Sequence, residues 1–152
     1  MEKIKIQDLT PGLVKGIEVQ MPTETAGYTE TYFEWTASSL VAKFNTTEIS
    51  GGILQTWHHV PVFQEVETQI DAEVFYYVSG VALMLFVDLK DGRPNMDSAQ
   101  IVRIQPGTQL IVPAGKGHFV AVAEGAKPVF AVIVSPKMDA PRTTLPVSVE
   151  GI

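Results

Sequence analysis

The chain has 152 residues, 45% of them hydrophobic, which is enough for one domain with a substantial core. It has no cysteine, which excludes disulfides, thiolate metal sites and a cysteine nucleophile. The formal net charge of −6, with lysines and arginines scattered along the chain, argues against nucleic acid as a partner.

The organisation of the chain is that of one unit. Its first residues, MEKIKIQDL, lack the apolar block of a signal peptide, and its longest apolar run, VALMLFV, is too short to cross a bilayer. We therefore expect a cytoplasmic protein without membrane contact. No repeat or linker interrupts the sequence. It predicts a single domain over residues 1–152, with a core at about 38–136 and an N-terminal arm and C-terminal tail packed outside it.

The N-terminal third contains few regular elements. Thr10 and Pro11 predict the start of one short helical turn, because threonine caps helices and proline suits the first helical position. Residues 22–31, PTETAGYTET, are polar and threonine-rich, which indicates a loop. SLVAKF and GGILQTWHHV, which follow, have the composition of strands.

The remainder of the chain predicts strand after strand. AEVFYYVSGVALMLFVDL contains two β-rich runs that meet at Ser79-Gly80, which indicates a tight hairpin. LKDGRPN predicts a second turn region at Asp91-Gly92 and Pro94-Asn95, and AQIVRIQ, TQLIVP, HFVAVAE and VFAVIVS follow as short strands. Turn signals every eight to twelve residues are typical of an all-β sandwich or barrel. The tail DAPRTTLPVSVEGI has two prolines and little periodicity, so we expect it to lie along the surface or to cover an edge.

A histidine follows a glycine-rich turn in GTQLIVPAGKGHFVAV, residues 107–122. Gly107 begins a strand, Pro113 ends it because it cannot donate to the ladder, and Gly115 and Gly117 permit positive φ in the reversal. His118 then begins the return strand and is expected to face the barrel interior near its mouth. There an imidazole can ligate a metal or contact a ligand.

This spacing resembles the second motif of the cupin superfamily, although Val122 stands where the motif has asparagine. The first cupin motif has a glutamate, six residues and a glycine, and Glu73 and Gly80 have that spacing. The His-x-His that should precede it is replaced by Glu67-Thr68-Gln69, or by Glu65-Val66-Glu67. Within the cupins, residues 65–135 are similar to ureidoglycolate lyase, although PAGKGHF keeps only His118 of that family's histidine-rich last turn. The resemblance implies an all-β, single-domain cupin-type double-stranded β-helix, a jelly-roll barrel, that forms a homodimer.

The resemblance also implies a site. We expect His118 and Glu73 to be catalytic residues. Glu67, Gln69, Glu73 and His118 form a candidate donor set for a divalent metal such as manganese, iron, nickel or zinc, since carboxylate, amide and imidazole donors suit such ions better than copper. The alternative is that Glu65 and Glu67 belong to an exposed polar face. Glu73 begins an otherwise apolar strand, so its carboxylate has to be solvated, paired or ligating.

Three further residues are candidates for substrate binding. Lys116 could anchor a carboxylate, or could be a solvated turn lysine. Tyr77 shares the strand parity of Glu73, so its hydroxyl could point into the pocket or pack in the core. His58 and His59 face opposite sides of a strand, so only one of the two can enter the pocket, and His59 is the candidate.

Two functions remain open from the sequence. The first is a carbon–nitrogen lyase that cleaves ureidoglycolate, or a related small hydroxy or oxo acid, with His118 or Glu73 moving the proton of the carbinol hydroxyl. The second is a binding module without catalytic activity, or a metal-dependent isomerase, for a small sugar or organic acid. The missing histidines and the plain PAGKG turn favour the binding module.

Overall fold

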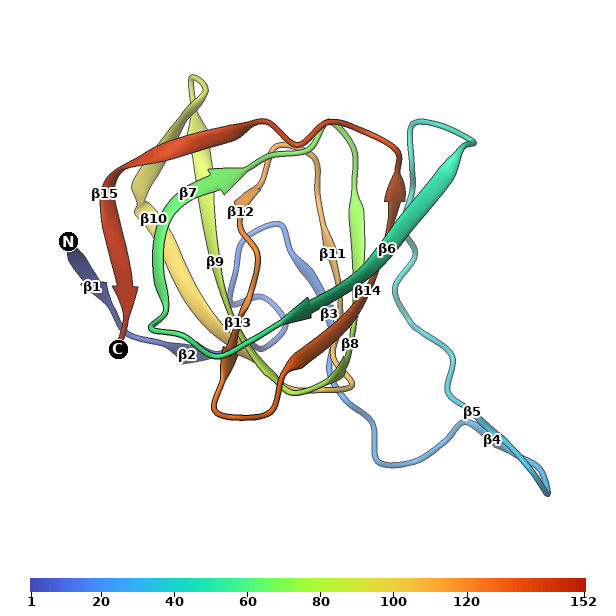
Figure 1. The fold of residues 1–152 in the computed structure, drawn as a ribbon. Coiled ribbons are helices and arrows are strands. Elements are labelled where there is room, and N and C mark those ends of the chain that lie inside the picture. Colours follow the sequence, from blue (N-terminus) through green and yellow to red (C-terminus); the bar gives the residue numbers. More distant parts are fainter.

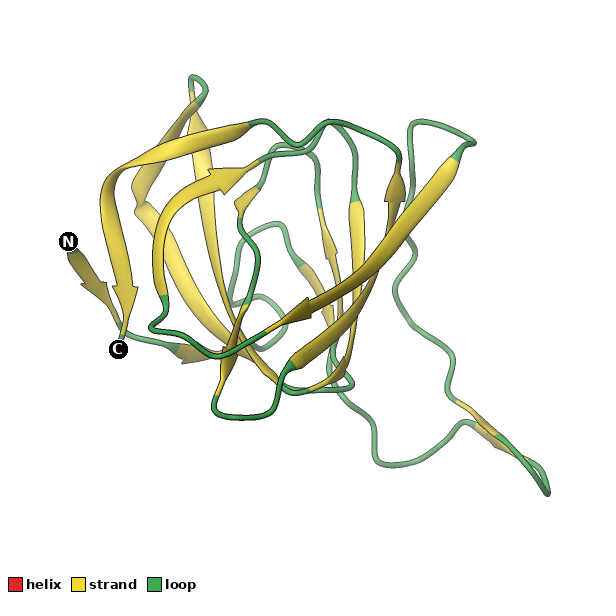
Figure 2. Ribbon diagram, viewed as in Figure 1, coloured by secondary structure: helices red, strands yellow, loops and turns green.

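The computed structural model describes residues 1–152 and consists of fifteen strands joined by turns and loops, with no helix (Figure 2). The all-β fold class is therefore confirmed. None of its elements is a helix that could span a membrane.

Sheet A is the larger of the two main sheets. Its strands lie in the order β1-β15-β7-β12-β9-β10-β2, and β13 also pairs with β9. The pairs are antiparallel except for β1 with β15 and β2 with β10. The eight strands are β1 (Glu2–Ile4), β2 (Gln7–Asp8), β7 (Val62–Glu67), β9 (Val81–Lys90), β10 (Arg93–Ile104), β12 (Gly117–His118), β13 (Val122–Glu124) and β15 (Arg142–Gly151).

Sheet B has five strands in the order β3-β11-β8-β14-β6, all antiparallel. They are β3 (Glu18–Gln20), β6 (Ile49–Thr56), β8 (Glu73–Ser79), β11 (Gln109–Val112) and β14 (Val129–Pro136). A separate small hairpin of β4 (Tyr28–Thr29) and β5 (Glu34–Trp35) projects away from the two sheets (Figure 1).

The strand order is that of a jelly roll. In sheet A the central strands run β7-β12-β9-β10, and in sheet B they run β6-β14-β8-β11, so the chain passes repeatedly from one sheet to the other (Figure 1). Two four-stranded sheets connected in this way form the double-sheet jelly roll to which cupins belong. The fold expected from the motif spacing is confirmed.

The two glycine turns differ from one another. Asp91 and Gly92 have φ of 51° and 75° and join β9 to its antiparallel partner β10, which confirms this hairpin. Gly80 also has positive φ, 76°, but β8 lies in sheet B and β9 in sheet A. The predicted hairpin at Ser79-Gly80 is therefore wrong: the turn is a corner between the sheets.

Several predicted local elements are also wrong. Pro94-Asn95 lies within β10, SLVAKF forms no strand, and HFVAVAE is interrupted between β12 and β13. The single short turn predicted at Thr10 is present, because the Thr10 carbonyl accepts a hydrogen bond of 3.1 Å from the N–H of Leu13, and no helix continues from it. Within the loop predicted at 22–31, Tyr28 and Thr29 pair with the second strand of the small hairpin.

The C-terminal tail is a regular part of sheet A rather than a surface segment. β15 pairs with β7 on one side and β1 on the other, and Leu145 and Val149 are buried. Its register with β7 shifts between Thr144 and Val149. This segment contains Pro146, which cannot donate to the ladder. The proline interrupts the alternating sequence pattern of a strand, although the segment forms one.

Two hydrophobic cores fill the molecule. The larger lies between the sheets and includes Phe75, Met84 and Phe86. The smaller lies within the curl of sheet A and includes Leu85 and Val149. β9 contributes alternate side chains to each core, because neighbouring residues of a strand point to opposite faces.

Candidate functional site

His118 lies in the interior, on a strand with partners on both sides. β12 pairs with β7 through Glu67 and with β9 through Phe86, and His118 is buried. A Cβ atom on Gly117 would lie 2.8 Å from side-chain atoms of both Val87 and Leu89, so only glycine permits β12 to approach β9 this closely. Gly117 therefore allows β12 to pair with β9, and this pairing places the imidazole of the next residue in the interior.

His118 and Glu73 meet in the interior. Nε2 of His118 lies 2.8 Å from Oε2 of Glu73, and Nδ1 lies 3.0 Å from the carbonyl oxygen of Lys116. The Nε2–Oε2 contact lacks the alignment of a good hydrogen bond, and neither atom has another partner. The ring packs edge-on against Phe75, with 6.0 Å between ring centroids, and beside Phe86 at 6.4 Å.

This geometry requires a shared proton. If Nδ1 donates its hydrogen to the Lys116 carbonyl, a neutral ring would turn the Nε2 lone pair toward a carboxylate oxygen. A proton on Nε2 or on the carboxyl relieves this repulsion. Burial lowers the pKa of His118, but the contact with Glu73, the bond to the Lys116 carbonyl and the charges of Glu73 and Glu67 outweigh burial, so its pKa is raised. The pair can therefore hold and transfer one proton.

The other two expected metal donors lie close by without completing a metal site. Glu67 is directly opposite His118 in the ladder and is half-buried, and burial together with the charge of Glu73 raises its pKa. Gln69 is buried, with its side-chain oxygen unpartnered and its backbone oxygen accepting from Gly115 N at 2.9 Å. No three histidine, aspartate or glutamate side chains are arranged to hold a metal ion. The donors present thus do not fit a divalent metal, since only Glu73 and His118 are in contact.

Lys116 is not a solvated turn residue, nor is it free to bind a carboxylate. Its side chain is buried, and Nζ lies 2.7 Å from Oδ1 of Asp88 and donates to the carbonyl oxygen of Lys15 at 3.0 Å. The sequence analysis missed Asp88 as a member of this group. Asp88 shares strand parity with the interior residues Met84 and Phe86, which is the signal that could have found it.

Tyr77 belongs to the core rather than the rim. It is fully buried, and its hydroxyl donates to the sulfur of Met84 at 3.2 Å. Burial, and to a lesser extent the charge of Glu73, raises the pKa of Tyr77. The core-packing alternative therefore describes this residue, and its hydroxyl does not face a pocket.

His58 and His59 lie apart from His118. Nδ1 of His58 is 2.9 Å from the carbonyl oxygen of Ala123, and Nδ1 of His59 is 2.7 Å from that of Val60. The N–H of Ala123 also donates to the carbonyl of Trp57 at 3.3 Å. The bonds of Trp57 and His58 to Ala123 fasten the segment after β6 to β13, and the polar contact of the His59 ring is local rather than with His118.

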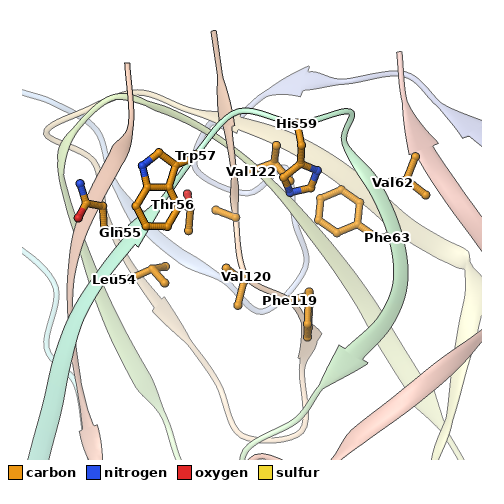
Figure 3. Close-up of a pocket in the computed structure, with 11 residues that line it drawn as sticks. Leu54, Gln55, Thr56, Trp57, His59, Val62, Phe63, Phe119, Val120 and Val122 are labelled. Atoms are coloured by element: carbon orange, nitrogen blue, oxygen red, sulfur yellow. The ribbon is translucent and has the colours of Figure 1, made fainter. Parts of the chain in front are cut away.

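His59 instead lines a cavity of about 350 Å³ between the edge of sheet B and the interrupted strand of sheet A, which we call the seam pocket. Figure 3 shows Trp57 on one side of the opening and His59 and Phe63 on the other. Thr56 is buried there, and its hydroxyl has no partner. Eight of the eleven lining residues are hydrophobic; the full set is Leu54, Gln55, Thr56, Trp57, His59, Val62, Phe63, Phe119, Val120, Ala121 and Val122.

The structure therefore divides the predicted site residues among three places. The first place is where β7 ends and β8 begins, and it holds His118, Glu73, Glu67 and Gln69. Beside them, Lys116 pairs with Asp88. Tyr77 is in the core, and His59 is in the seam pocket. None of the five main cavities is lined by His118 or Glu73.

No protein-family model matches the sequence, the family of ureidoglycolate lyase included, and no curated protein matches it. The chain is similar in structure to oxalate decarboxylase of Bacillus subtilis. One such structure comes from work on the Mn(II) centres of that enzyme, and two others are single-residue variants. In each the identity is 21% and the TM-score 0.47, over 64% of this chain and 24% of the other. This chain thus spans about a quarter of the length of those it matches. A likeness at this level carries no information about the activity of this chain.

Proposed function

We propose that the protein is a binding module for a small, largely apolar molecule that carries one polar group, and that the seam pocket is its binding site. The observation that carries this proposal is the contrast between the two candidate sites. The seam pocket is an open cavity with apolar walls and a buried hydroxyl without a partner. The interior around His118 is occupied by Phe75 and Phe86.

The chemistry of the pocket selects the ligand class. Small-molecule sites are usually apolar cavities of about 300–1,000 Å³ with a few polar groups that set orientation. Thr56 supplies a hydroxyl that can donate or accept. With Nδ1 of His59 donating to a carbonyl, its Nε2 is left as an acceptor. Apolar walls with two polar groups favour an aromatic or aliphatic ligand with one hydroxyl or carboxyl group over a sugar.

One wall of the pocket is held in place from outside. The guanidinium of Arg142 lies 5.0 Å from the ring centroid of Phe119, and it is also 2.9 Å from the carboxylate of Glu65. A ring fixed by a cation and by its neighbours needs little reordering when a ligand enters. Such preorganisation favours binding.

Fluorescence titration tests this proposal, because Trp57 lines the pocket and Trp35 is the only other tryptophan. In the Trp35→Phe background, phenol and toluene should each change the emission of Trp57 saturably, and glucose should not. Thr56→Val should weaken the binding of phenol by about 3–10-fold, the contribution of one hydrogen bond, and leave the binding of toluene unchanged. Val120→Phe, which fills the lip, should abolish both responses. Responses that Val120→Phe leaves intact would contradict the proposal.

The second candidate is a lyase that acts on ureidoglycolate or a related hydroxy acid, and the His118–Glu73 contact favours it. In this function the pair removes the proton of the carbinol hydroxyl, the carbonyl of glyoxylate forms, the C–N bond breaks, and urea nitrogen takes up a proton. The substrate carboxylate would displace Asp88 from Lys116, since Nζ is already paired.

Glyoxylate release from ureidoglycolate tests the lyase directly. Turnover that disappears in His118→Ala and Glu73→Gln, but persists in Val120→Phe, would make the lyase the function. If no turnover is found and ligands bind at the seam pocket, the result would support the binding module and contradict the lyase.

A further inference from the structure

A segment between β3 and residue 38 forms an arm that extends away from the barrel. The arm, residues 21–37, carries the β4-β5 hairpin at its tip and leaves the barrel on the side of sheet B (Figure 1). Its base is fastened: the hydroxyl of Ser39 donates to the side-chain oxygen of Gln20 at 2.8 Å, and the N–H of Asn45 donates to Oδ2 of Asp71 at 2.8 Å. The fixed base sets the direction in which the arm projects.

The tip of the arm is aromatic and has no partner in the barrel. Tyr32 is 97% exposed and Trp35 63%, and Tyr28 and Phe33 are also exposed. Their one aromatic contact is with each other, between Tyr28 and Phe33, at 5.9 Å between ring centroids. Four exposed aromatic side chains on one projection form an apolar patch of the kind that marks an interaction site.

The same chain presents a complementary surface on the outer side of sheet B. Ile53, Val132 and Tyr76 lie side by side across β6, β14 and β8 and form one row. Val78 and Phe130 extend it, and we call these five residues the outer face. Ile53 remains 69% exposed and Val78 60%. The face is thus an apolar sheet surface beside the arm that the chain itself does not cover.

We infer that the chain forms a reciprocal dimer in which the arm of each copy packs its aromatic tip on the outer face of the other. The arm projects on the side of sheet B (Figure 1), the sheet whose strands β8, β14 and β6 carry the outer face. A twofold axis between two facing B sheets brings each arm onto the partner's face. Such an isologous contact closes on itself without further growth.

The area available is that of a stable dimer. A buried aromatic side chain contributes about 150–250 Å², so four that are half to fully exposed offer on the order of 400 Å² of ring surface. Two arms and the two faces they cover would remove about 1,600 Å² from water, in the range of standard specific interfaces. The proposal concerns a surface distinct from the seam pocket, so it does not depend on ligand binding there.

Disulfide trapping tests the contact, because the chain contains no cysteine of its own. A tagged Tyr32→Cys chain and an untagged Val78→Cys chain are mixed, allowed to exchange and oxidised. The mixed disulfide should exceed, by at least about tenfold, that formed with Ala126→Cys, an exposed position outside the arm and the face. A mixed disulfide no more abundant than this control would overturn the inference. So would a Tyr32→Cys/Val78→Cys double variant that cross-links within a single chain.

Sedimentation equilibrium gives an independent measurement. The wild-type chain should be a dimer at micromolar concentration, and Phe33→Ser and Trp35→Ser should each raise the dimer dissociation constant by at least about 30-fold, as expected for buried aromatic anchors. Val41→Ser, which removes an exposed apolar side chain outside both surfaces, should leave it unchanged. A wild-type monomer at 100 micromolar, or equal effects of all three substitutions, would contradict the dimer.

Discussion

At the scale of single residues, the most informative feature is the contact between two buried ionisable side chains. His118 and Glu73 are 2.8 Å apart in an interior otherwise made of aromatic and aliphatic groups. A charged pair in such a place gains attraction but loses hydration, so it adds little net stability, while removal of one partner is costly. The consequence of the pair is a dependence of stability on pH.

The direction of that dependence follows from the raised pKa of His118. A group whose pKa is higher in the folded state stabilises the fold fully below its unfolded value, about 6.5 for histidine, and this stability is lost as the pH rises through the folded value. We therefore expect the free energy of unfolding to fall above about pH 6.5, by at most ~1.4 kcal/mol per pH unit, the slope of one proton. Urea titrations from pH 5 to 9 measure it.

Two variants separate the groups involved. Glu73→Gln removes the partner that holds the proton, so the loss of stability above pH 6.5 should disappear. Glu67 also has a raised pKa, but the ordinary pKa of a glutamate is about 4.3, so its own loss of stability begins at lower pH. Glu67→Gln should remove this lower part and weaken the upper part only slightly, because the charge of Glu67 is the smallest of the causes that raise the pKa of His118. A wild-type profile that stays flat above pH 6.5, or that Glu73→Gln does not alter, would contradict the shared proton.

Sequence spacing predicted some of these residues better than others. The site shared by His118 and Glu73 was implied by the resemblance of their two segments to the cupin motifs, because motif spacing fixes where each strand begins. The role of Lys116 was not implied, because its ion pair with Asp88 joins residues 28 positions apart through a flexible side chain. The four candidate metal donors were predicted from their residue types and positions in the sequence, whereas a metal site needs donors that converge on one point in space.

At the scale of elements, the sequence distinguished turns from strands but not one sheet from another. Gly80 and Gly92 have the same dihedral angle, φ of 76° and 75°, and both follow a polar residue. One is a corner between sheets and the other closes a hairpin, and this difference depends on contacts far along the chain. The same reason explains why β15, with its internal Pro146, was expected to lie along the surface or cover an edge and was not predicted as a regular strand.

The two glycines offer a matched test of that difference. A Cβ atom on Gly80 would lie 2.3 Å from the carbonyl oxygen of Pro128, whereas a Cβ atom on Gly92 would meet nothing within 4 Å. Gly92→Ala should therefore cost only the backbone strain, about 1–2 kcal/mol. Gly80→Ala should cost a further ~1–3 kcal/mol for the clash. Urea unfolding followed by circular dichroism compares them, and equal losses would show that Gly80 is not in contact with Pro128.

At the scale of the whole molecule, two hydrophobic cores share one strand. Met84 belongs to the core between the sheets and Leu85 to the core inside the curl of sheet A, and both are almost completely buried. If β9 moved away from one core, the side chains that it contributes to the other core would also be exposed, because the two sets alternate along the same backbone. The two cores are therefore joined through β9.

A shared strand predicts that the cores unfold together. Met84→Ala and Leu85→Ala should each lower stability by about 2–5 kcal/mol, the cost of a large-to-small change in a core, and each should shift one cooperative transition. The emission of Trp57, which lies at the seam, and the circular dichroism of the strands should give the same midpoint in both variants. A two-step transition in Leu85→Ala, with a change in Trp57 emission only in the second step, would contradict this prediction. The curl of sheet A would then unfold as a separate unit, and the seam pocket would depend on the core between the sheets alone.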